Sequence, residues 1–151
     1  MESGLENRVV LVTGASGGIG SSMVRAFLAE DSKVAVHYGN QRDSAEKLAT
    51  ESEGRAKAFQ ADLTQEAEVE RLFGDIESEL GPVECVIANA GIWPAENVPI
   101  HEMTLTQWNK TLAVDLTSVF LTMRRFFIGI RNFELKDPSA VLIGSTAAVF
   151  G

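Results

Sequence analysis

Cysteine and positive charge are scarce in this sequence. The single cysteine, Cys85, excludes an intrachain disulfide and favours a reducing compartment, and its place in the apolar run 83–88 predicts a buried side chain. Thirteen Lys and Arg oppose twenty-one Asp and Glu, and the resulting net charge of −8 repels phosphate backbones and anionic lipids. We therefore expect neither nucleic acid nor a membrane as a partner.

Targeting signals, membrane spans and metal-ligand clusters are lacking as well. The first eight residues hold two glutamates and no apolar stretch, unlike a secretory signal. The longest apolar segment, 112–130, contains three charged residues, Asp115 among them, so it is predicted to be a buried helix rather than a membrane span. The histidines, His37 and His101, are too isolated to indicate a metal site. We expect a cytoplasmic protein without a bound metal.

The length and the pattern of apolar residues indicate one α/β domain. A chain of 151 residues with 45% hydrophobic residues is typical of a single globular domain, here 1–151. Short β-branched runs alternate with segments of helical periodicity, which is typical of βαβ units. The predicted strands are 9–13, 34–37, 56–60, 83–88 and 140–144, and the predicted helices are 19–30, 44–53, 66–80 and 104–133. Right-handed crossovers then predict a doubly wound parallel sheet with the strand order 3-2-1-4-5.

A glycine-rich segment, TGASGGIG over residues 13–20, follows the first predicted strand and opens the first predicted helix. Gly14 fits the turn off the strand, Gly18 lets a pyrophosphate approach the backbone, and Gly20 permits close packing of helix on sheet. The free N–H groups at the start of the helix favour an anion. A tight turn without a ligand is the alternative interpretation.

The spacing G-x-x-x-G-x-G resembles that of the short-chain dehydrogenase/reductase family, and other segments match the family in the same order. Asp62-Leu63 follows the third strand, Asn89-Ala90-Gly91 ends the fourth, and Ser145 follows the fifth. These segments resemble the family's adenine-contacting pair, its N-A-G motif and its catalytic serine. The resemblance implies an NAD(P)-binding Rossmann fold and reversible hydride transfer to or from a small carbonyl or alcohol substrate.

The resemblance also implies which residues bind the dinucleotide. They are Gly14, Ser16, Gly18, Ile19, Gly20, Arg42, Asp62, Leu63, Asn89, Ala90 and Gly91. For three of the matched positions the residues allow a second interpretation: Asp62 as a loop or helix-capping residue, and Asn89 and Ser145 as turn residues.

The end of the second strand favours NADP(H) over NAD(H). An enzyme that selects NAD commonly has an acid there, which binds the ribose 2′-OH and repels a 2′-phosphate. This segment has no acid at the strand end, and Arg42 follows closely. Asp43 partly offsets that charge, and Gly17 stands where many NADP-using relatives carry a basic residue, so a solvated Arg42 is the alternative.

The sequence departs from the family pattern at two places. Asp115 stands where the family has an asparagine that supports a proton relay, and its carboxylate lacks the amide donor. The family's Y-x-x-x-K motif, expected about thirteen residues after Ser145, is not in the chain, whose only tyrosine is Tyr38. We therefore expect a domain incomplete at its C-terminus and a sheet without the family's last strands.

The predicted function is an NADP(H)-dependent oxidoreductase, present as an N-terminal portion that is inactive alone. The alternative is a non-catalytic dinucleotide-binding or interaction protein derived from the family. Without further elements the fifth strand would be an apolar edge, with Val141, Leu142 and Ile143 open to pairing. In relatives the helix corresponding to 104–133 joins a dimer face, so we expect a homo-oligomer through this helix.

Overall fold

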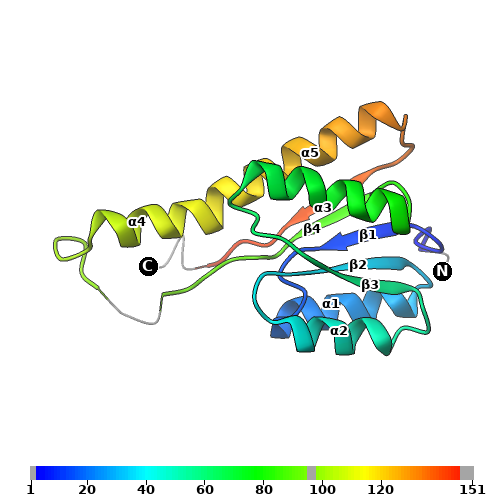
Figure 1. The fold of residues 1–151 in the computed structure, drawn as a ribbon, viewed down its shortest axis with the longest axis horizontal. Helices are drawn as coiled ribbons and strands as arrows, with labels where there is room; N and C mark the ends of the chain where they lie inside the picture. Colours follow the sequence, from blue (N-terminus) through cyan, green and yellow to red (C-terminus); the bar gives the residue numbers. More distant parts are fainter. Residues whose placement is uncertain (1–2, 95–97, 147–151) are drawn as a thin grey trace.

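The computed structural model describes residues 3–94 and 98–146, in which strands and helices alternate (Figure 1). The strands are β1 (Val9–Val12), β2 (Lys33–Tyr38), β3 (Ala56–Gln60), β4 (Cys85–Ala88) and β5 (Ser139–Leu142). The helices are α1 (Gly18–Ala29), α2 (Arg42–Thr50), α3 (Glu66–Glu79), α4 (Leu105–Leu112) and α5 (Ser118–Asn132), with a π-helical turn, η1 (Ala113–Thr117), between the last two. The predicted α/β alternation is confirmed.

The five strands form one parallel sheet in the order β3-β2-β1-β4-β5, which confirms the predicted order. β1 lies in the centre, where Val10 pairs with Val34 of β2 on one side and with Cys85 of β4 on the other. Cys85 is buried, as predicted. Because the winding direction reverses between β1 and β4, ligands in such sheets bind outside the carboxyl ends of these strands.

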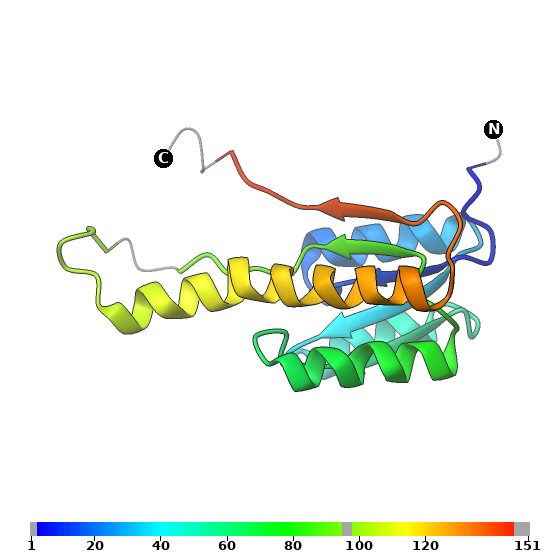
Figure 2. The same ribbon diagram turned by 90° about the horizontal axis from the view of Figure 1, so that it is seen from above.

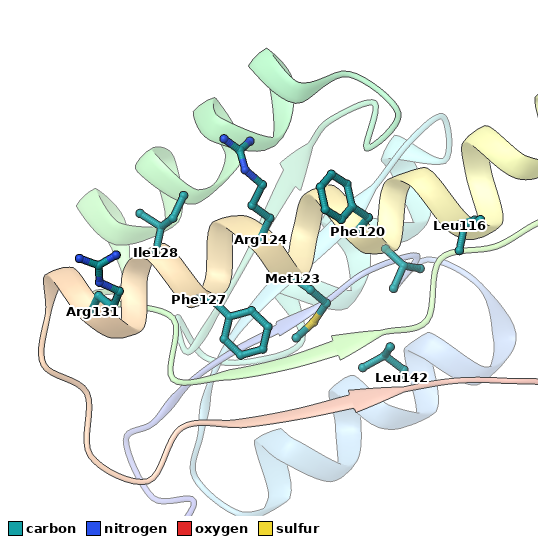
Figure 3. Close-up of a pocket in the computed structure, with 9 residues that line it drawn as sticks. Leu116, Phe120, Met123, Arg124, Phe127, Ile128, Arg131 and Leu142 are labelled. Atoms are coloured by element: carbon teal, nitrogen blue, oxygen red, sulfur yellow. The ribbon is translucent and has the colours of Figure 1, made fainter.

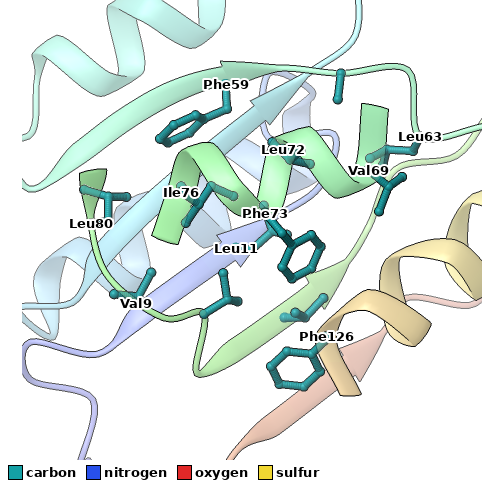
Figure 4. Packing of buried hydrophobic residues seen from close by; sticks show 14 of the residues in the cluster. Val9, Leu11, Phe59, Leu63, Val69, Leu72, Phe73, Ile76, Leu80 and Phe126 are labelled. Carbon is teal, nitrogen blue, oxygen red and sulfur yellow. The ribbon is translucent and has the colours of Figure 1, made fainter. Parts of the chain in front are cut away.

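Alternate strand residues face two separate hydrophobic clusters. Leu11 lies on the side of α3 and α5, where Phe73 and Phe126 pack against it and its neighbours (Figure 4). Val12 lies on the side of α1 and α2, in a cluster with Val24. Figure 1 shows these two helix pairs on opposite faces of the sheet. The central strands are apolar throughout because both of their faces are covered.

The segment predicted as one helix over 104–133 is helical without a gap from Leu105 to Asn132, so that prediction is confirmed, and a π-helical turn lies inside it. Thr104 caps α4: its Oγ1 accepts from the N–H of Gln107, whose Oε1 accepts from the N–H of Thr104. The turn η1, with Asp115 at its centre, joins α4 directly to α5. Figures 1 and 2 show α4 extending beyond the carboxyl ends of the strands, so η1 lies near the edge of the sheet where ligands bind.

The outer strand and one face of α5 leave apolar side chains exposed. Leu142 of β5 is 57% exposed, and Phe120 and Phe127 of α5 are 60% and 57% exposed. Within the described residues β5 pairs with β4 alone, and it begins and ends earlier than the predicted 140–144. The expected apolar edge is confirmed for this part of the chain, and one apolar face of α5 is exposed as well. In residues 3–94 and 98–146, no helix is long and apolar enough to cross a membrane.

Candidate functional site

A cleft of about 460 Å³ opens at the carboxyl ends of the strands. It is lined by residues at or just after the ends of β1 to β4 and by residues in and beside η1, namely Gly14, His37, Gly39, Asn40, Gln60, Ala61, Asp62, Leu63, Thr64, Ala90, Gly91, Ile92, Lys110, Val114 and Ser118. Of the predicted dinucleotide residues, the cleft brings together Gly14, Asp62, Leu63, Ala90 and Gly91. Ser16 in the loop and Ile19 in the first turn of α1 lie outside this lining.

The three motif glycines have different surroundings. Gly14 has a φ of +61°, and a Cβ there would lie 2.9 Å from the Cα of Ala90. A Cβ at Gly20 would lie 2.4 Å from the carbonyl oxygen of Gly14. A Cβ at Gly18 would meet no described atom within 4 Å. The fold therefore requires glycine at positions 14 and 20, whereas Gly18 keeps space open at the N-terminus of α1, where an anionic group is favoured.

Thr13 and Asn89 tie the end of β4 to the glycine-rich loop. The Oγ1 of Thr13 accepts from the N–H groups of Asn89 and Ala90, both at 2.9 Å, and donates to the carbonyl oxygen of Ile87 at 3.3 Å. The Nδ2 of Asn89 donates to the carbonyl oxygens of Thr13 and Gly14 at 3.0 and 3.3 Å. The side chain of Asn89 thus holds the loop in place. Sequence reasoning did not assign Thr13 a role, and its position directly before Gly14 was the only signal.

His37 is a second buried polar residue below the cleft. The N–H of Gly14 donates to its Nδ1 at 3.1 Å, and its Nε2 lies 3.1 Å from the carbonyl oxygen of Ala61. Burial lowers the pKa of His37 to about 4, while the Ala61 carbonyl acts in the opposite direction. The imidazole is therefore neutral near pH 7. Sequence reasoning assigned it no role, although a polar residue near the end of an apolar strand is a detectable signal.

Asp62 and Leu63 lie between β3 and α3, at the mouth of the cleft. The Oδ1 of Asp62 accepts from the N–H and the hydroxyl of Thr64, at 2.9 and 2.7 Å. This local turn agrees with the loop interpretation of Asp62. Leu63 is buried in the cluster under α3. Contact of these two residues with an adenine ring stays a prediction.

Arg42 begins α2 beside a smaller hollow of about 400 Å³, which adjoins the main cleft at Asn40. The Nε of Arg42 donates to the Oε1 of Glu46 at 2.6 Å, and this bond raises the pKa of the guanidinium. Both side chains are exposed. Because exposed ion pairs contribute little to stability, Arg42 is able to leave Glu46 for a stronger anion.

Asp115 and Ser145 lie outside the lining of the cleft. The Oδ1 of Asp115 accepts from the N–H of Ile92 at 2.8 Å and joins η1 to the loop after β4. An asparagine oxygen accepts in the same way, so the change to Asp keeps this bond. Ser145 is exposed and follows β5 at the carboxyl edge of the sheet. Among the described residues there is no group of three or more His, Cys, Asp or Glu able to hold a metal ion.

Comparison with known proteins shows the family. The family model for short chain dehydrogenases matches residues 8–151, and the chain belongs to this family. A short-chain dehydrogenase/reductase mutant from Serratia marcescens has a similar structure, with a TM-score of 0.85 and 28% sequence identity. That match covers 95% of this chain and 58% of the other. Members of the family bind NAD(P) and a small-molecule substrate.

Three curated relatives are similar in sequence. The NADP-dependent mannitol dehydrogenase of Alternaria alternata is 35% identical, over 93% of this chain and 54% of that protein. The uncharacterized oxidoreductase YuxG of Bacillus subtilis is 34% identical, over 99% of this chain and 22% of that protein. The 2,3-dihydro-2,3-dihydroxybenzoate dehydrogenase of Bacillus subtilis is 29% identical, over 96% of this chain and 55% of that protein. The chain thus spans between about a fifth and just over half of these relatives.

Proposed function

We propose that the chain is the dinucleotide-binding part of an NADP(H)-dependent, cytoplasmic oxidoreductase acting on a small carbonyl or alcohol substrate. The observation that carries this proposal is the difference in free space around the three motif glycines, Gly14, Gly18 and Gly20. Protein atoms surround Gly14 and Gly20, whereas the space above Gly18 is open at the N-terminus of α1. A loop of this kind, at the reversal of winding in a parallel sheet, suits a pyrophosphate.

Each part of the site has a role in this proposal. Ser16, Gly18 and Ile19 bind the pyrophosphate and its neighbouring ribose at the start of α1, where the helix dipole favours the negative charge. Asp62 and Leu63 contact the adenine from the mouth of the cleft. Asn89 holds the loop through its bonds to the carbonyl oxygens of residues 13 and 14, and Ala90-Gly91 line the ribose side.

The catalytic part of the proposal concerns Ser145 and Asp115. When bound, the nicotinamide supplies or accepts the hydride. Ser145 would polarise the substrate oxygen, and Asp115 would hold the loop after β4 through the N–H of Ile92. We expect no carbonyl reduction by the 151 residues alone, because their one tyrosine, Tyr38, is buried in β2. NADPH oxidation with simple aldehydes and ketones should therefore stay at background, and a normal turnover would contradict this expectation.

Preference for NADP(H) is assigned to Arg42. Arg42 lies beside the 400 Å³ hollow that adjoins the cleft. Its ion pair with Glu46 is exposed, so a phosphate group can replace the Glu46 carboxylate as its partner. The NADP dependence named for the mannitol dehydrogenase relative supports the same preference.

The test is a titration of the chain and its Arg42→Ala variant with NADPH and with NADH, followed by nicotinamide fluorescence. We expect the variant to bind NADPH about tenfold more weakly and NADH nearly unchanged, because only NADPH carries the 2′-phosphate. Arg25→Ala is the matched control, since Arg25 is an exposed arginine paired with one carboxylate, Glu51. An equal loss for both dinucleotides would contradict the role of Arg42. No binding of either dinucleotide would contradict the proposed function.

A second candidate function, as an interaction protein, is supported by an apolar groove along the exposed face of α5, beside Leu142 of β5 (Figure 3). The groove has a volume of about 660 Å³ and is lined by Leu116, Val119, Phe120, Met123, Arg124, Phe127, Ile128, Arg131 and Leu142. Exposed apolar patches of this kind mark sites of association. We propose that the chain forms a homo-oligomer through the segment 104–133, which supplies all of these residues except Leu142.

A further inference from the structure

His37 connects two segments of the cleft from inside the sheet. Two consecutive N–H groups of the glycine-rich loop bind this one residue: the N–H of Gly14 donates to Nδ1 at 3.1 Å, and the N–H of Ala15 donates to the backbone carbonyl at 2.9 Å. On the other side the Nε2 lies 3.1 Å from the carbonyl oxygen of Ala61. His37 is only 3% exposed, yet it contributes to the lining of the cleft.

These contacts define one tautomer of the imidazole. A backbone N–H can only donate, so the Nδ1 that faces Gly14 must carry a lone pair. A carbonyl oxygen can only accept, so the Nε2 that faces Ala61 must carry the proton. An imidazolium would place a second N–H against the N–H of Gly14 and remove that bond. The lowered pKa of about 4 agrees with a ring that stays neutral in the folded chain.

The position of Gly14 decides where the rest of the loop lies. Gly14 packs against the backbone of Ala90, and its carbonyl oxygen lies next to Gly20 in α1. A movement of Gly14 would therefore displace the N-terminus of α1, where Gly18 lies. Ala61 directly precedes Asp62, on the other side of the cleft. The ring of His37 thus sets the separation between the loop and the end of β3.

We propose that His37, as a neutral imidazole protonated at Nε2, is a positioning residue of the dinucleotide site that holds the glycine-rich loop through the N–H of Gly14. This inference rests on the proposed function, because the site that His37 positions is the proposed dinucleotide site. His37 itself contacts the loop and not the reacting atoms, so its effect is on dinucleotide affinity.

Two substitutions separate the two hydrogen bonds of the ring. In His37→Asn the amide oxygen replaces Nδ1 and keeps an acceptor for the N–H of Gly14, while the bond to Ala61 is lost. In His37→Gln the amide nitrogen replaces Nε2 and keeps the donor to Ala61, while the acceptor for Gly14 is lost. Each variant leaves one buried backbone group without its partner, so the two form a matched pair for effects on stability.

The binding test is a titration of each protein with NADPH. We expect the dissociation constant of His37→Asn to stay within about threefold of the unmodified chain and that of His37→Gln to rise by about tenfold or more. Equal affinities of His37→Gln and the unmodified chain would overturn the positioning role and leave the proposed function intact. Equal losses in both variants would also overturn it. Failure of the unmodified chain to bind NADPH or NADH would overturn both proposals.

The tautomer can be tested on the unmodified chain, so this test does not depend on whether a variant folds. Nitrogen-15 spectra of the unmodified chain at neutral pH should show the ring of His37 with its proton on Nε2 and none on Nδ1. Where His37→Asn folds, the amide signal of Gly14 should keep the low-field position of a hydrogen-bonded N–H. A proton on Nδ1 of His37 in the unmodified chain would overturn the proposal.

Discussion

Each motif glycine is required for a different reason at the scale of single residues. At Gly20 the nearest obstacle to a side chain is the carbonyl oxygen of Gly14, 2.4 Å from an added Cβ. At Gly18 no described atom lies within 4 Å of such a Cβ. Gly20 is therefore needed for the fold, whereas Gly18 is needed only when a ligand binds above it.

This difference predicts opposite outcomes for two alanine variants. Gly18→Ala should keep or slightly raise the free energy of unfolding, by about 0.5 kcal/mol, because alanine favours the helix. It should weaken NADPH binding by about tenfold or more, since its methyl group occupies the space left for the ligand. Gly20→Ala should lower the free energy of unfolding by about 3 kcal/mol or prevent folding, because the methyl group overlaps the loop. Urea unfolding and NADPH titration measure both; unchanged NADPH affinity in Gly18→Ala would contradict the ligand role.

The buried imidazole of His37 makes the free energy of unfolding depend on pH. Its pKa in the folded chain is about 4, below the ordinary 6.5, so the unfolded chain binds the proton more readily. The stabilisation is fully present above pH 6.5 and is lost as the pH falls toward 4, at up to about 1.4 kcal/mol per pH unit and about 3 kcal/mol in total. Urea unfolding from pH 7 to 4 should show a smaller decline in His37→Asn, which has no imidazole. Parallel declines in the two proteins would contradict a neutral buried ring.

The sequence predicts the parts of the site that depend on local motifs and misses those that depend on distant contacts. Gly14 was predicted from the turn between a strand and a helix, and Asp62 and Asn89-Ala90-Gly91 were predicted from their resemblance to local motifs of the family. The link between His37 and Gly14 joins residues 23 positions apart, and the link between Thr13 and Asn89 joins residues 76 positions apart. Their partners depend on the register of neighbouring strands, which no local pattern specifies.

At the scale of elements, α5 is held to α3 by charged side chains as well as by the core. Arg125 is the central residue: its Nε lies 2.9 Å from Glu70, its Nη2 donates to Glu77 at 2.8 and 2.9 Å, and its guanidinium lies 5.1 Å above the ring of Phe73. Its side chain is only 11% exposed. The neighbouring Arg124 pairs with Glu66 in a more exposed position.

We predict that replacing the largely buried Arg125 lowers stability strongly and that replacing the adjacent, exposed Arg124 lowers it only slightly. Arg125→Met should lower the free energy of unfolding by about 3 kcal/mol, because Glu77 would be left partly buried without its cation. Arg124→Met should lower it by less than about 1 kcal/mol, because an exposed ion pair contributes little. Urea unfolding of the two variants gives the comparison, with the same side chain introduced in each. Similar losses of unfolding free energy in the two variants would contradict the idea that burial makes the Arg125 ion pairs the more important ones for stability.

The sequence predicts the elements well where periodicity is regular and less well where packing changes the helix. The strand at 56–60 has the predicted bounds, and α3 differs by one residue at its end. The segment 104–133 is one helix, as predicted, but the π-helical form of Ala113–Thr117 inside it does not follow from the apolar pattern. The apolar pattern runs through this turn, and its π-helical form accompanies a contact of Asp115 with the distant loop at Ile92.

At the scale of the whole molecule, one side is covered by helices and the other ends in open apolar surface. α1, α2 and α3 cover the strands up to β4, whereas β5 lies at the outer edge of the sheet in Figure 2. Phe120 and Phe127 of α5 and Leu142 of β5 line the same groove (Figure 3). Burial of this apolar surface would be favourable, either by pairing of another strand with β5 or by packing against the exposed face of α5.

We therefore predict that the 151-residue chain associates with itself through the groove between α5 and β5. Light scattering coupled to size-exclusion chromatography should give a mass above the monomer's at micromolar concentration. Replacing both Phe120 and Phe127 by Glu should shift the chain toward monomer, because charged side chains would have to lose water in the contact. Ile100→Glu is the control: it removes a 73% exposed apolar side chain elsewhere, so it should leave the mass unchanged. A monomeric unmodified chain, or equal effects of the groove and control substitutions, would contradict association through this surface.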